Sequence, residues 1–447
     1  MPRLLACLLL LAACVHAANE PRTNILLIMA DDIGIGDTGF SGGKDFPTPN
    51  IDRLAREGAV FTQGYLTAPV CSPSRAGLLS GRYQQRFGHE MNPNEGAVEQ
   101  QGLPLSEKLL PARLREAGYR TAIVGKWHLG TEAPYQPMAR GFDEQPLGFL
   151  GGSRNYTGQG KGIGKGLLTD GKPVELQGYL TDALGDAGAR FIRRTTDKPW
   201  FLYAAFNAAH GPLQPDEAVM ARVPAALKGS RRKFAGLMLS LDDAVGKLLA
   251  AIKESGQDER TLIVFISDNG GQTQVGADNL NLRGRKGMTW EGGIRTPMAV
   301  RWPGKVKPGT TLAAPTITLD LTATCVDLAT GKVPADYDGR SLLGALTRGE
   351  TLDPNRPLHW RFGTQWATRV GDWKLVRAAG AESAELHNLA ADPSEQKDLA
   401  KAQPEKLREL EAAHAAWNKT LVAPLWRGNK GQDVGEPGEK ERQESKK

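Results

Sequence analysis

The chain has 447 residues, of which 40% are hydrophobic, and its formal net charge at pH 7 is +6. This length allows a large buried core and predicts two domains. The basic residues are spread along the chain rather than gathered in long runs, so we expect no nucleic-acid partner.

Residues 1–18 have the pattern of a signal segment. Arg3 supplies a positive charge, and the apolar stretch over residues 4–13 is too short to span a bilayer. The residues before position 18 suit a signal peptidase, whereas the sequence L-A-A-C ending at Cys14 resembles a bacterial lipobox. No later stretch has the length of a transmembrane span. We therefore expect an exported protein, periplasmic or extracellular, with a lipid anchor on Cys14 as the alternative.

Cysteine usage excludes a disulfide-rich scaffold. Once the signal segment is removed, Cys71 and Cys325 remain, together with Cys14 if that residue is lipidated. The sequence leaves open whether Cys71 and Cys325 form a bridge. An unpaired thiol is prone to oxidation in an exported protein, so Cys71 need not remain a thiol.

Continuous apolar runs alternate with amphipathic segments over the first part of the mature chain. The apolar runs predict strands at residues 24–30, 59–61, 121–125, 199–207 and 261–267. The amphipathic segments predict helices at residues 48–55, 105–117, 179–193 and 234–254. The glycine-rich residues 151–171 predict a loop or small hairpin. This alternation predicts an α/β sandwich with a large, mostly parallel central sheet.

The pattern changes beyond about residue 330. Short runs separated by turns predict a small antiparallel sheet at residues 358–362, 366–370 and 373–376. A helix is expected at residues 405–416, and the charged residues 427–447 predict a disordered tail. We therefore expect a main domain over residues 22–330 and a C-terminal α+β subdomain over residues 331–426.

The stretch over residues 70–82 predicts a loop that runs into a helix. It places Cys71 at the N-terminus of that helix, four residues before Arg75. Backbone N–H groups and the guanidinium both favour an anion at such a place. Taken alone, a cysteine here is more often a buried structural residue.

Two predicted strands end in pairs of oxygen ligands. Asp31 and Asp32 follow the first strand, and Asp268 and Asn269 follow the strand at residues 261–267. Carboxylates crowded at one sheet edge repel one another, and a hard cation such as Ca²⁺ or Mg²⁺ removes the conflict. The alternative is that each pair caps a turn or helix.

Four further polar residues follow strands or lie in a basic loop: Lys126, His128, His210 and Lys286. Each one alone is more often a solvated or hydrogen-bonded residue than a ligand. Together with a hard cation and a candidate nucleophile, they describe a site for an anionic ester whose negative charge grows on oxygen.

These residues carry a resemblance to a known family. The sequence C-S-P-S-R at residues 71–75, followed by L-S-G-R at 79–82, resembles the signature of type I sulfatases of the alkaline phosphatase superfamily. Other blocks in the same order resemble that family at residues 31–32, 125–130, 210, 268–271, 286, 291–293, 371–375 and 385–389. The resemblance covers nearly the whole mature chain.

The resemblance implies a fold, a cofactor and site roles. The fold would be the alkaline-phosphatase-like sandwich, with residues 22–330 as its catalytic domain. A formylglycine-generating enzyme would oxidise Cys71 to formylglycine, whose hydrate, oriented by Arg75, would be the nucleophile. One Ca²⁺ would be held by Asp31, Asp32, Asp268 and Asn269. His128 would act as a base, and the sulfate oxygens or the leaving group would be bound by Lys126, His210 and Lys286.

The expected activity is hydrolysis of a sulfate ester, more of a carbohydrate than of a simple aryl alcohol. Two other functions stay open at this point. Related metal-dependent enzymes cleave phosphate mono- or diesters on this fold. If Cys71 is not converted, the chain would be a sulfated-glycan-binding protein without turnover.

Overall fold

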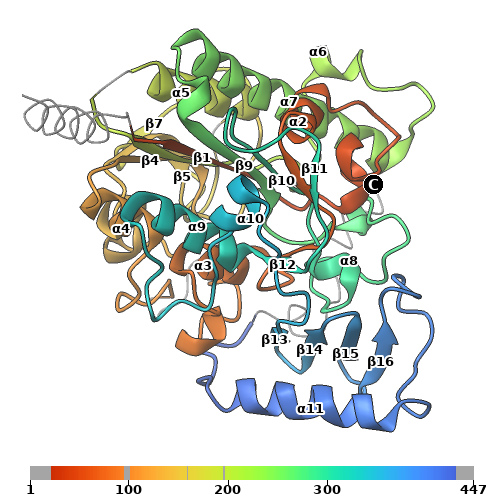
Figure 1. Ribbon diagram of the computed structural model, residues 1–447. Helices are drawn as coiled ribbons and strands as arrows, with labels where there is room; N and C mark the ends of the chain where they lie inside the picture. Colours follow the sequence, from red (N-terminus) through yellow and green to blue (C-terminus); the bar gives the residue numbers. More distant parts are fainter. Residues whose placement is uncertain (1–21, 95–100, 159, 195–196, 429–447) are drawn as a thin grey trace, which may run out of the picture.

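The computed structural model describes residues 22–94, 101–158, 160–194 and 197–428 (Figure 1). The predicted signal segment and nearly all of the predicted tail lie outside these ranges. No helix in the described ranges is long and apolar enough to cross a bilayer.

A ten-stranded sheet forms the centre of the main domain, in the order β11-β2-β10-β9-β1-β8-β4-β5-β6-β7. Its strands are β1 (Asn24–Ala30), β2 (Ala59–Phe61), β4 (Arg120–Lys126), β5 (Glu144–Phe149), β6 (Leu167–Thr169), β7 (Lys172–Val174), β8 (Trp200–Ala205), β9 (Thr261–Ser267), β10 (Met298–Arg301) and β11 (Thr310–Leu312). The central strands β9, β1, β8, β4 and β5 run parallel to one another. Towards the edges β10, β6 and β7 pair antiparallel, so the sheet is mixed with a parallel centre.

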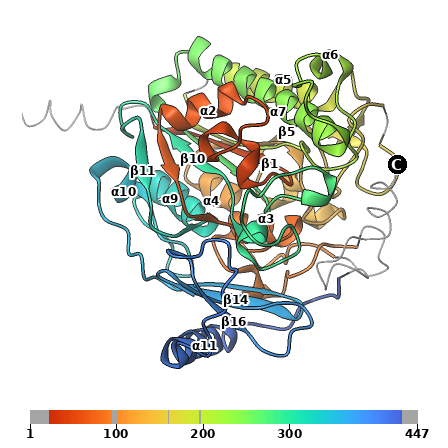
Figure 2. The same ribbon diagram turned by 90° about the vertical axis from the view of Figure 1, so that its right-hand side faces the viewer.

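Helices cover both faces of this sheet (Figures 1 and 2). One face packs against α2 (Pro49–Arg56), α5 (Leu180–Arg193) and α7 (Gly229–Glu254). The other packs against α3 (Cys71–Ser80), α4 (Leu110–Glu116), α9 (Thr318–Thr330) and α10 (Leu343–Arg348). Alternate residues of β1 serve the two cores, with Leu26 and Ile28 on the first face and Ile25 and Leu27 on the second. This alternation explains why β1 is a continuous apolar run.

The short elements α6 (Glu217–Met220) and α8 (Glu291–Ile294) complete the main domain, together with a small parallel pair of β3 (Gly64–Tyr65) and β12 (Thr316–Ile317). The C-terminal antiparallel sheet contains β13 (Leu358–Phe362), β14 (Gln365–Val370), β15 (Trp373–Arg377) and β16 (Glu385–Asn388). One face carries α11 (Pro404–Asn418), with Leu410 packed on Leu375 and Leu386. The other packs Trp360 against Tyr65 and Ile294 of the main domain.

The predicted α/β sandwich and C-terminal sheet are confirmed. The prediction of a helix at residues 105–117 was wrong at its start, because α4 begins only at Leu110, where Pro111 fixes the first turn. The helix predicted from residue 234 begins earlier, at Gly229. The domain boundary after residue 330 stays a prediction.

Candidate active site

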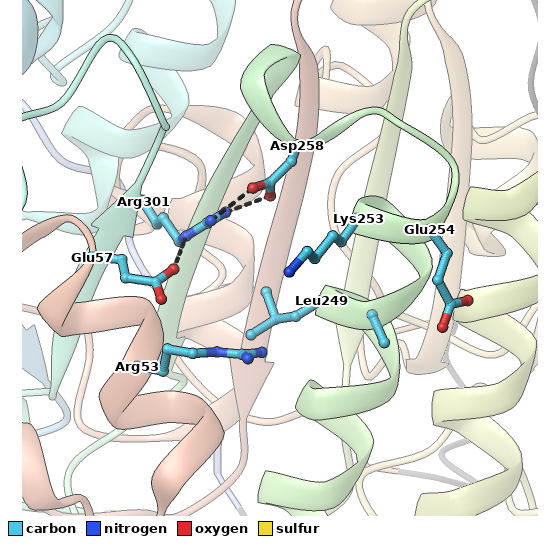
Figure 3. A pocket seen from close by; sticks show the side chains of 8 residues that line it. Arg53, Glu57, Leu249, Lys253, Glu254, Asp258 and Arg301 are labelled. Carbon is cyan, nitrogen blue, oxygen red and sulfur yellow. Dashed lines mark hydrogen bonds and ion pairs between the residues drawn. The ribbon is translucent and has the colours of Figure 1, made fainter.

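A pocket of about 310 Å³ lies between α2, α7 and the end of β10 (Figure 3). Asp258 precedes β9 and Arg301 ends the antiparallel β10, so this pocket lies at the opposite sheet edge from Asp268, which follows β9. Arg301 donates hydrogen bonds to Glu57 at 2.8 Å and to Asp258 at 2.6 Å. These ion pairs join the chain after α2 and the chain after α7 to the sheet.

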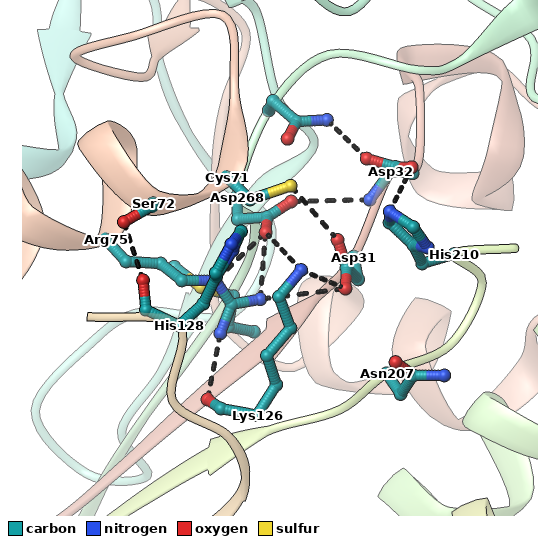
Figure 4. A network of polar contacts seen from close by, with 12 residues as sticks. Asp31, Asp32, Cys71, Ser72, Arg75, Lys126, His128, Asn207, His210 and Asp268 are labelled. Carbon is teal, nitrogen blue, oxygen red and sulfur yellow. Dashed lines mark hydrogen bonds and ion pairs between the residues drawn. The ribbon is translucent and has the colours of Figure 1, made fainter. Parts of the chain in front are cut away.

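The predicted site residues gather instead at the carboxyl edge of the parallel strands (Figure 4). Ala30 of β1 pairs with Ser267 of β9, so Asp31 and Asp268 leave the sheet side by side. On the other side of β1, Ala205 of β8 pairs with both β1 and β4. That register brings the chain after β8 and the end of β4 to the same edge, as expected for parallel strands.

Cys71 is the first residue of α3 and is buried against this edge. Its thiol donates to Asp31 Oδ1, with 3.8 Å between sulfur and oxygen. One turn later, Arg75 donates from Nε and Nη2 to Asp268 Oδ2 at 3.0 and 2.8 Å. Arg75 also donates to the main-chain oxygen of Lys126 at 3.1 Å, which ties α3 to the end of β4.

Two lysines neutralise the carboxylates that follow β1. Lys126 Nζ lies 2.7 Å from Asp31 Oδ2 and 3.8 Å from Asp268 Oδ2, and all three side chains are fully buried. Lys286 Nζ lies 2.7 Å from Asp32 Oδ1. Each lysine loses hydration here, but its carboxylate partner keeps the pKa of the ammonium group raised above the ordinary value.

The pKa values of the buried carboxyl groups shift in different directions. Burial raises the pKa of Asp31 well above its ordinary value, and the nearby carboxylate of Asp268 raises it further. Burial acts on Asp268 in the same direction, but the Arg75 guanidinium and Lys126 outweigh it and hold the pKa of that carboxyl below its usual range. A cation bound beside Asp31 would therefore stabilise the ionised form that burial disfavours.

The site contains side chains that could hold a metal ion. Ligand atoms of Asp31, Asp32, Cys71 and His210 lie within 4.8 Å of one another. On Asp31 and Asp268 the Oδ2 atoms face the fixed cations. The side-chain oxygen of Asn269 is buried and has no hydrogen-bond partner among the described residues, while its amide donates to Asp32 Oδ1 at 2.8 Å. Such an unpaired buried acceptor is costly unless an ion or donor meets it.

The two histidines lie on different sides of this cluster (Figure 4). Burial lowers the pKa of His128 well below its ordinary value, with Lys126 adding to the shift, and burial lowers the pKa of His210 to about 4. Both rings are therefore neutral near pH 7. His210 Nδ1 donates to Gly211 O at 2.7 Å, which leaves the lone pair of Nε2 facing Asp32 Oδ2 at 3.5 Å. A proton or a metal ion between those atoms would relieve the repulsion.

His128 adopts a left-handed backbone conformation with φ of 59°. Such strain persists only where the surroundings fix the chain. The N–H of His128 donates to Leu150 O at 3.0 Å, and its carbonyl accepts from the Ser72 hydroxyl at 2.6 Å. Ser72 in turn lies 2.7 Å from His89 Nε2. These contacts fix the main chain of His128 against Ser72, the residue that follows Cys71.

The structure brings the predicted side chains to one sheet edge and adds supporting residues that the sequence did not indicate. Ser72, His89 and Tyr203 contact the site, and Tyr203 accepts from Arg75 at 3.4 Å. Ser72 lies inside the quoted motif and could have been found there. His89 and Tyr203 belong to no motif, and only the folded chain places them at the site.

Comparisons with known proteins show which family the chain belongs to. The family model described as Sulfatase matches residues 23–332, and that of the N-sulphoglucosamine sulphohydrolase C-terminal region matches residues 285–413. Steryl-sulfatase of Mus musculus is 33% identical over 437 residues, covering 78% of this chain and 69% of the relative. N-acetylgalactosamine-6-sulfatase of Canis lupus familiaris is 35% identical over 400 residues, covering 82% and 74%.

Solved structures show the same similarity. The crystal structure of Ps i-CgsB in complex with k-i-k-neocarrahexaose superposes with a TM-score of 0.86 at 35% identity and covers 93% of this chain and 96% of that one. The PsFucS1 sulfatase from Pseudoalteromonas sp. gives a TM-score of 0.76 at 26% identity, covering 91% and 92%. The chain therefore belongs to the sulfatase family, and it is a sulfatase with an alkaline-phosphatase-like fold.

Proposed function

We propose that this sulfatase releases sulfate from a sulfated carbohydrate by means of a formylglycine at position 71 and one bound Ca²⁺. The observation that carries the proposal is the place of Cys71. It begins a helix at the carboxyl edge of the sheet, 3.8 Å from Asp31 and one turn before the buried Arg75.

The unmodified thiol is poorly suited to attack sulfur in this place. Burial raises the pKa of the Cys71 thiol to about 12, so almost none of it is ionised at neutral pH. A soft thiolate is also a poor ligand for the hard cation that the carboxylates favour. Formylglycine hydrate supplies two hydroxyl groups on one carbon, one for attack on sulfur and one whose deprotonation expels the sulfate. A separate formylglycine-generating enzyme would be the maturation partner.

The metal ligands in this proposal are Asp31, Asp32, Asp268 and Asn269. Their donors are all oxygen atoms, which suit Ca²⁺ better than zinc. When bound, the ion supplies positive charge for a sulfate oxygen and for the hydroxyl groups at position 71. The buried, unpaired oxygen of Asn269 supports this assignment.

The remaining cations would bind the charge that develops on the sulfate group. Arg75 and Lys126 are fully buried at the site, so they are already oriented and desolvated before the substrate arrives. Lys286 and His210 lie against Asp32. They would bind a sulfate oxygen or the leaving oxygen. Neutral His128, held beside position 71, would take a proton during expulsion of sulfate.

The choice of a carbohydrate substrate rests on the relatives. One relative at 35% identity is named for a sulfated amino sugar, and one solved structure at 35% identity holds k-i-k-neocarrahexaose. A relative at 33% identity is named for a sterol instead, so the sugar is a proposal drawn from the majority of these names. We propose export to the periplasm or extracellular space on the basis of residues 1–18, with the Cys14 lipid anchor as the alternative.

The test uses chain produced together with a formylglycine-generating enzyme. Sulfate release is measured on defined sulfated saccharides, on an aryl sulfate and on the phosphate ester of the same aryl alcohol. We expect turnover of sulfate esters and a much lower rate with the phosphate. If the phosphate ester were hydrolysed faster than the sulfate ester, the site would be one for phosphate esters. If peptide mass spectrometry showed that Cys71 is not converted, a binding protein without turnover would be favoured.

A further inference from the structure

The tip of the β13–β14 hairpin reaches the loop that carries Lys286. Gln365, the first residue of β14, has 1% of its surface exposed. Its side-chain amide donates to Gly287 O at 2.7 Å, and its carbonyl oxygen accepts from Thr289 N at 3.2 Å. One side chain of the C-terminal sheet thus binds both ends of a short segment that begins next to Lys286.

That segment is also joined to the two other parts of the site. Lys286 N donates to Gly271 O at 3.2 Å, in the chain just after Asn269. Gly287 N donates to Pro69 O at 2.8 Å, two residues before Cys71. Gly287 has φ of 84°, which suits glycine and turns the chain sharply between these contacts. Gln365 supplies the third point of attachment, from a different sheet.

We propose that Gln365 is a positioning residue for Lys286, so that the C-terminal sheet completes the active site. The inference rests on the proposed function, in which Lys286 binds an oxygen of the sulfate or of the leaving group. Gln365 itself touches no reacting atom, and its contacts are to the main chain of residues 287 and 289.

The physical reason lies in the buried main chain. Thr289 has no exposed surface and Gly287 is buried, so their polar groups need partners inside the protein. Without the amide of Gln365, the segment would shift to find other partners. Lys286 Nζ is held 2.7 Å from Asp32, and a displacement of about 1 Å at a reacting group can lower a rate by about 100-fold.

The test is a double-mutant cycle on the formylglycine-bearing enzyme, with kcat/KM for an aryl sulfate as the readout. In the otherwise unsubstituted enzyme, Gln365→Met should lower kcat/KM by about 10- to 100-fold. In the Lys286→Met background the same substitution should change kcat/KM by no more than about twofold, because the ammonium group that Gln365 positions is absent. Equal losses in the two backgrounds would overturn the proposal, as would no loss in the first.

Gln85→Met is the matched control. Gln85 is equally buried and donates across the same domain interface, to Arg361 O at 2.9 Å, but does not contact the Lys286 segment. Its kcat/KM should stay within about twofold of the unsubstituted enzyme. If Gln85→Met lowered kcat/KM as much as Gln365→Met does, any disturbance of this interface would lower activity, and the proposal would be overturned.

A second variant covers the case in which Gln365→Met does not fold. Gln365→Glu keeps the acceptor for Thr289 N and removes the donor to Gly287 O, and the same non-additivity with Lys286→Met is expected. The unsubstituted enzyme is assayed alongside. If the proposed function is wrong, the unsubstituted enzyme shows no turnover. If only this inference is wrong, the substitution at Gln365 lowers kcat/KM by the same factor with Lys286 present and with Lys286→Met.

Discussion

At the scale of single residues, the chemical state of position 71 decides what the site can do. Cys71 contributes one long contact, to Asp31, and otherwise fills space at the start of α3. In the proposed function residue 71 becomes the nucleophile, so Cys71→Ala should lower sulfate release by at least about 1,000-fold. The thermal midpoint should stay close to that of the parent chain. Near-normal turnover by Cys71→Ala would contradict the nucleophile assignment.

Asp268 connects the fixed cations to the proposed metal. Its Oδ2 accepts from Arg75, and its Oδ1 lies 3.3 Å from the main-chain nitrogen of Asp32. Asp268→Ala should lower activity and bound calcium together, since one ligand is removed and Arg75 loses its partner. Elemental analysis of the purified variant checks the metal. An unchanged calcium content would argue against Asp268 as a ligand.

The buried side chain of His89 should make the stability of the protein depend on pH. Burial lowers the pKa of His89 to about 3, so below pH 6.5 the unfolded chain binds a proton that the folded chain refuses. Stability is therefore lost as pH falls. In His89→Gln the loss in free energy of unfolding between pH 7.5 and pH 5 should be smaller by about 2 kcal/mol. Denaturant titrations at both pH values give this difference, and parallel losses in the two proteins would contradict it.

At the scale of elements, the long buried strands could be predicted because both faces of β1 and β9 are covered and each reads as one apolar run. Their ends also predicted the oxygen ligands. The start of α4 could not be placed, because residues 105–109 have helical spacing but adopt turns. The strand β16 was missed, since four residues with two buried side chains give little signal. Gln365 belonged to no motif, and its role depends on contacts across domains.

Gly125 shows how a strand fixes the site. It lies in β4 with φ of 98°, just before Lys126, and an added Cβ would lie 2.0 Å from Ala205 O of β8. Gly125→Ala should lower the free energy of unfolding by about 3 kcal/mol or more and displace Lys126. Gly166→Ala is the control, because nothing lies within 4 Å of its added Cβ. Equal stabilities for the two variants would contradict this account of β4.

At the scale of the whole molecule, a buried ion cluster joins the C-terminal sheet to the main domain. Lys374 of β15 lies 2.9 Å from Glu291 of α8 and 2.8 Å from Glu395, and all three are buried. Lys374→Met removes the cation that Glu395 and Glu291 share, and Glu291 keeps the more distant Arg295, at 3.6 Å, so the free energy of unfolding should fall by about 3–5 kcal/mol. Chemical denaturation measures the change. Stability equal to that of the parent would mean that the apolar contacts alone hold the interface.

The chain is a sulfatase, and we propose that its nucleophile is made after synthesis. The most direct test compares two preparations of this chain, one produced together with a formylglycine-generating enzyme and one produced without it. For each preparation, mass spectrometry of the peptide that carries residue 71 gives the fraction of formylglycine, and sulfate release from a sulfated saccharide is measured. We predict that release rises in proportion to the fraction of formylglycine and is absent when residue 71 is entirely cysteine. Full release from the unconverted protein would contradict the account.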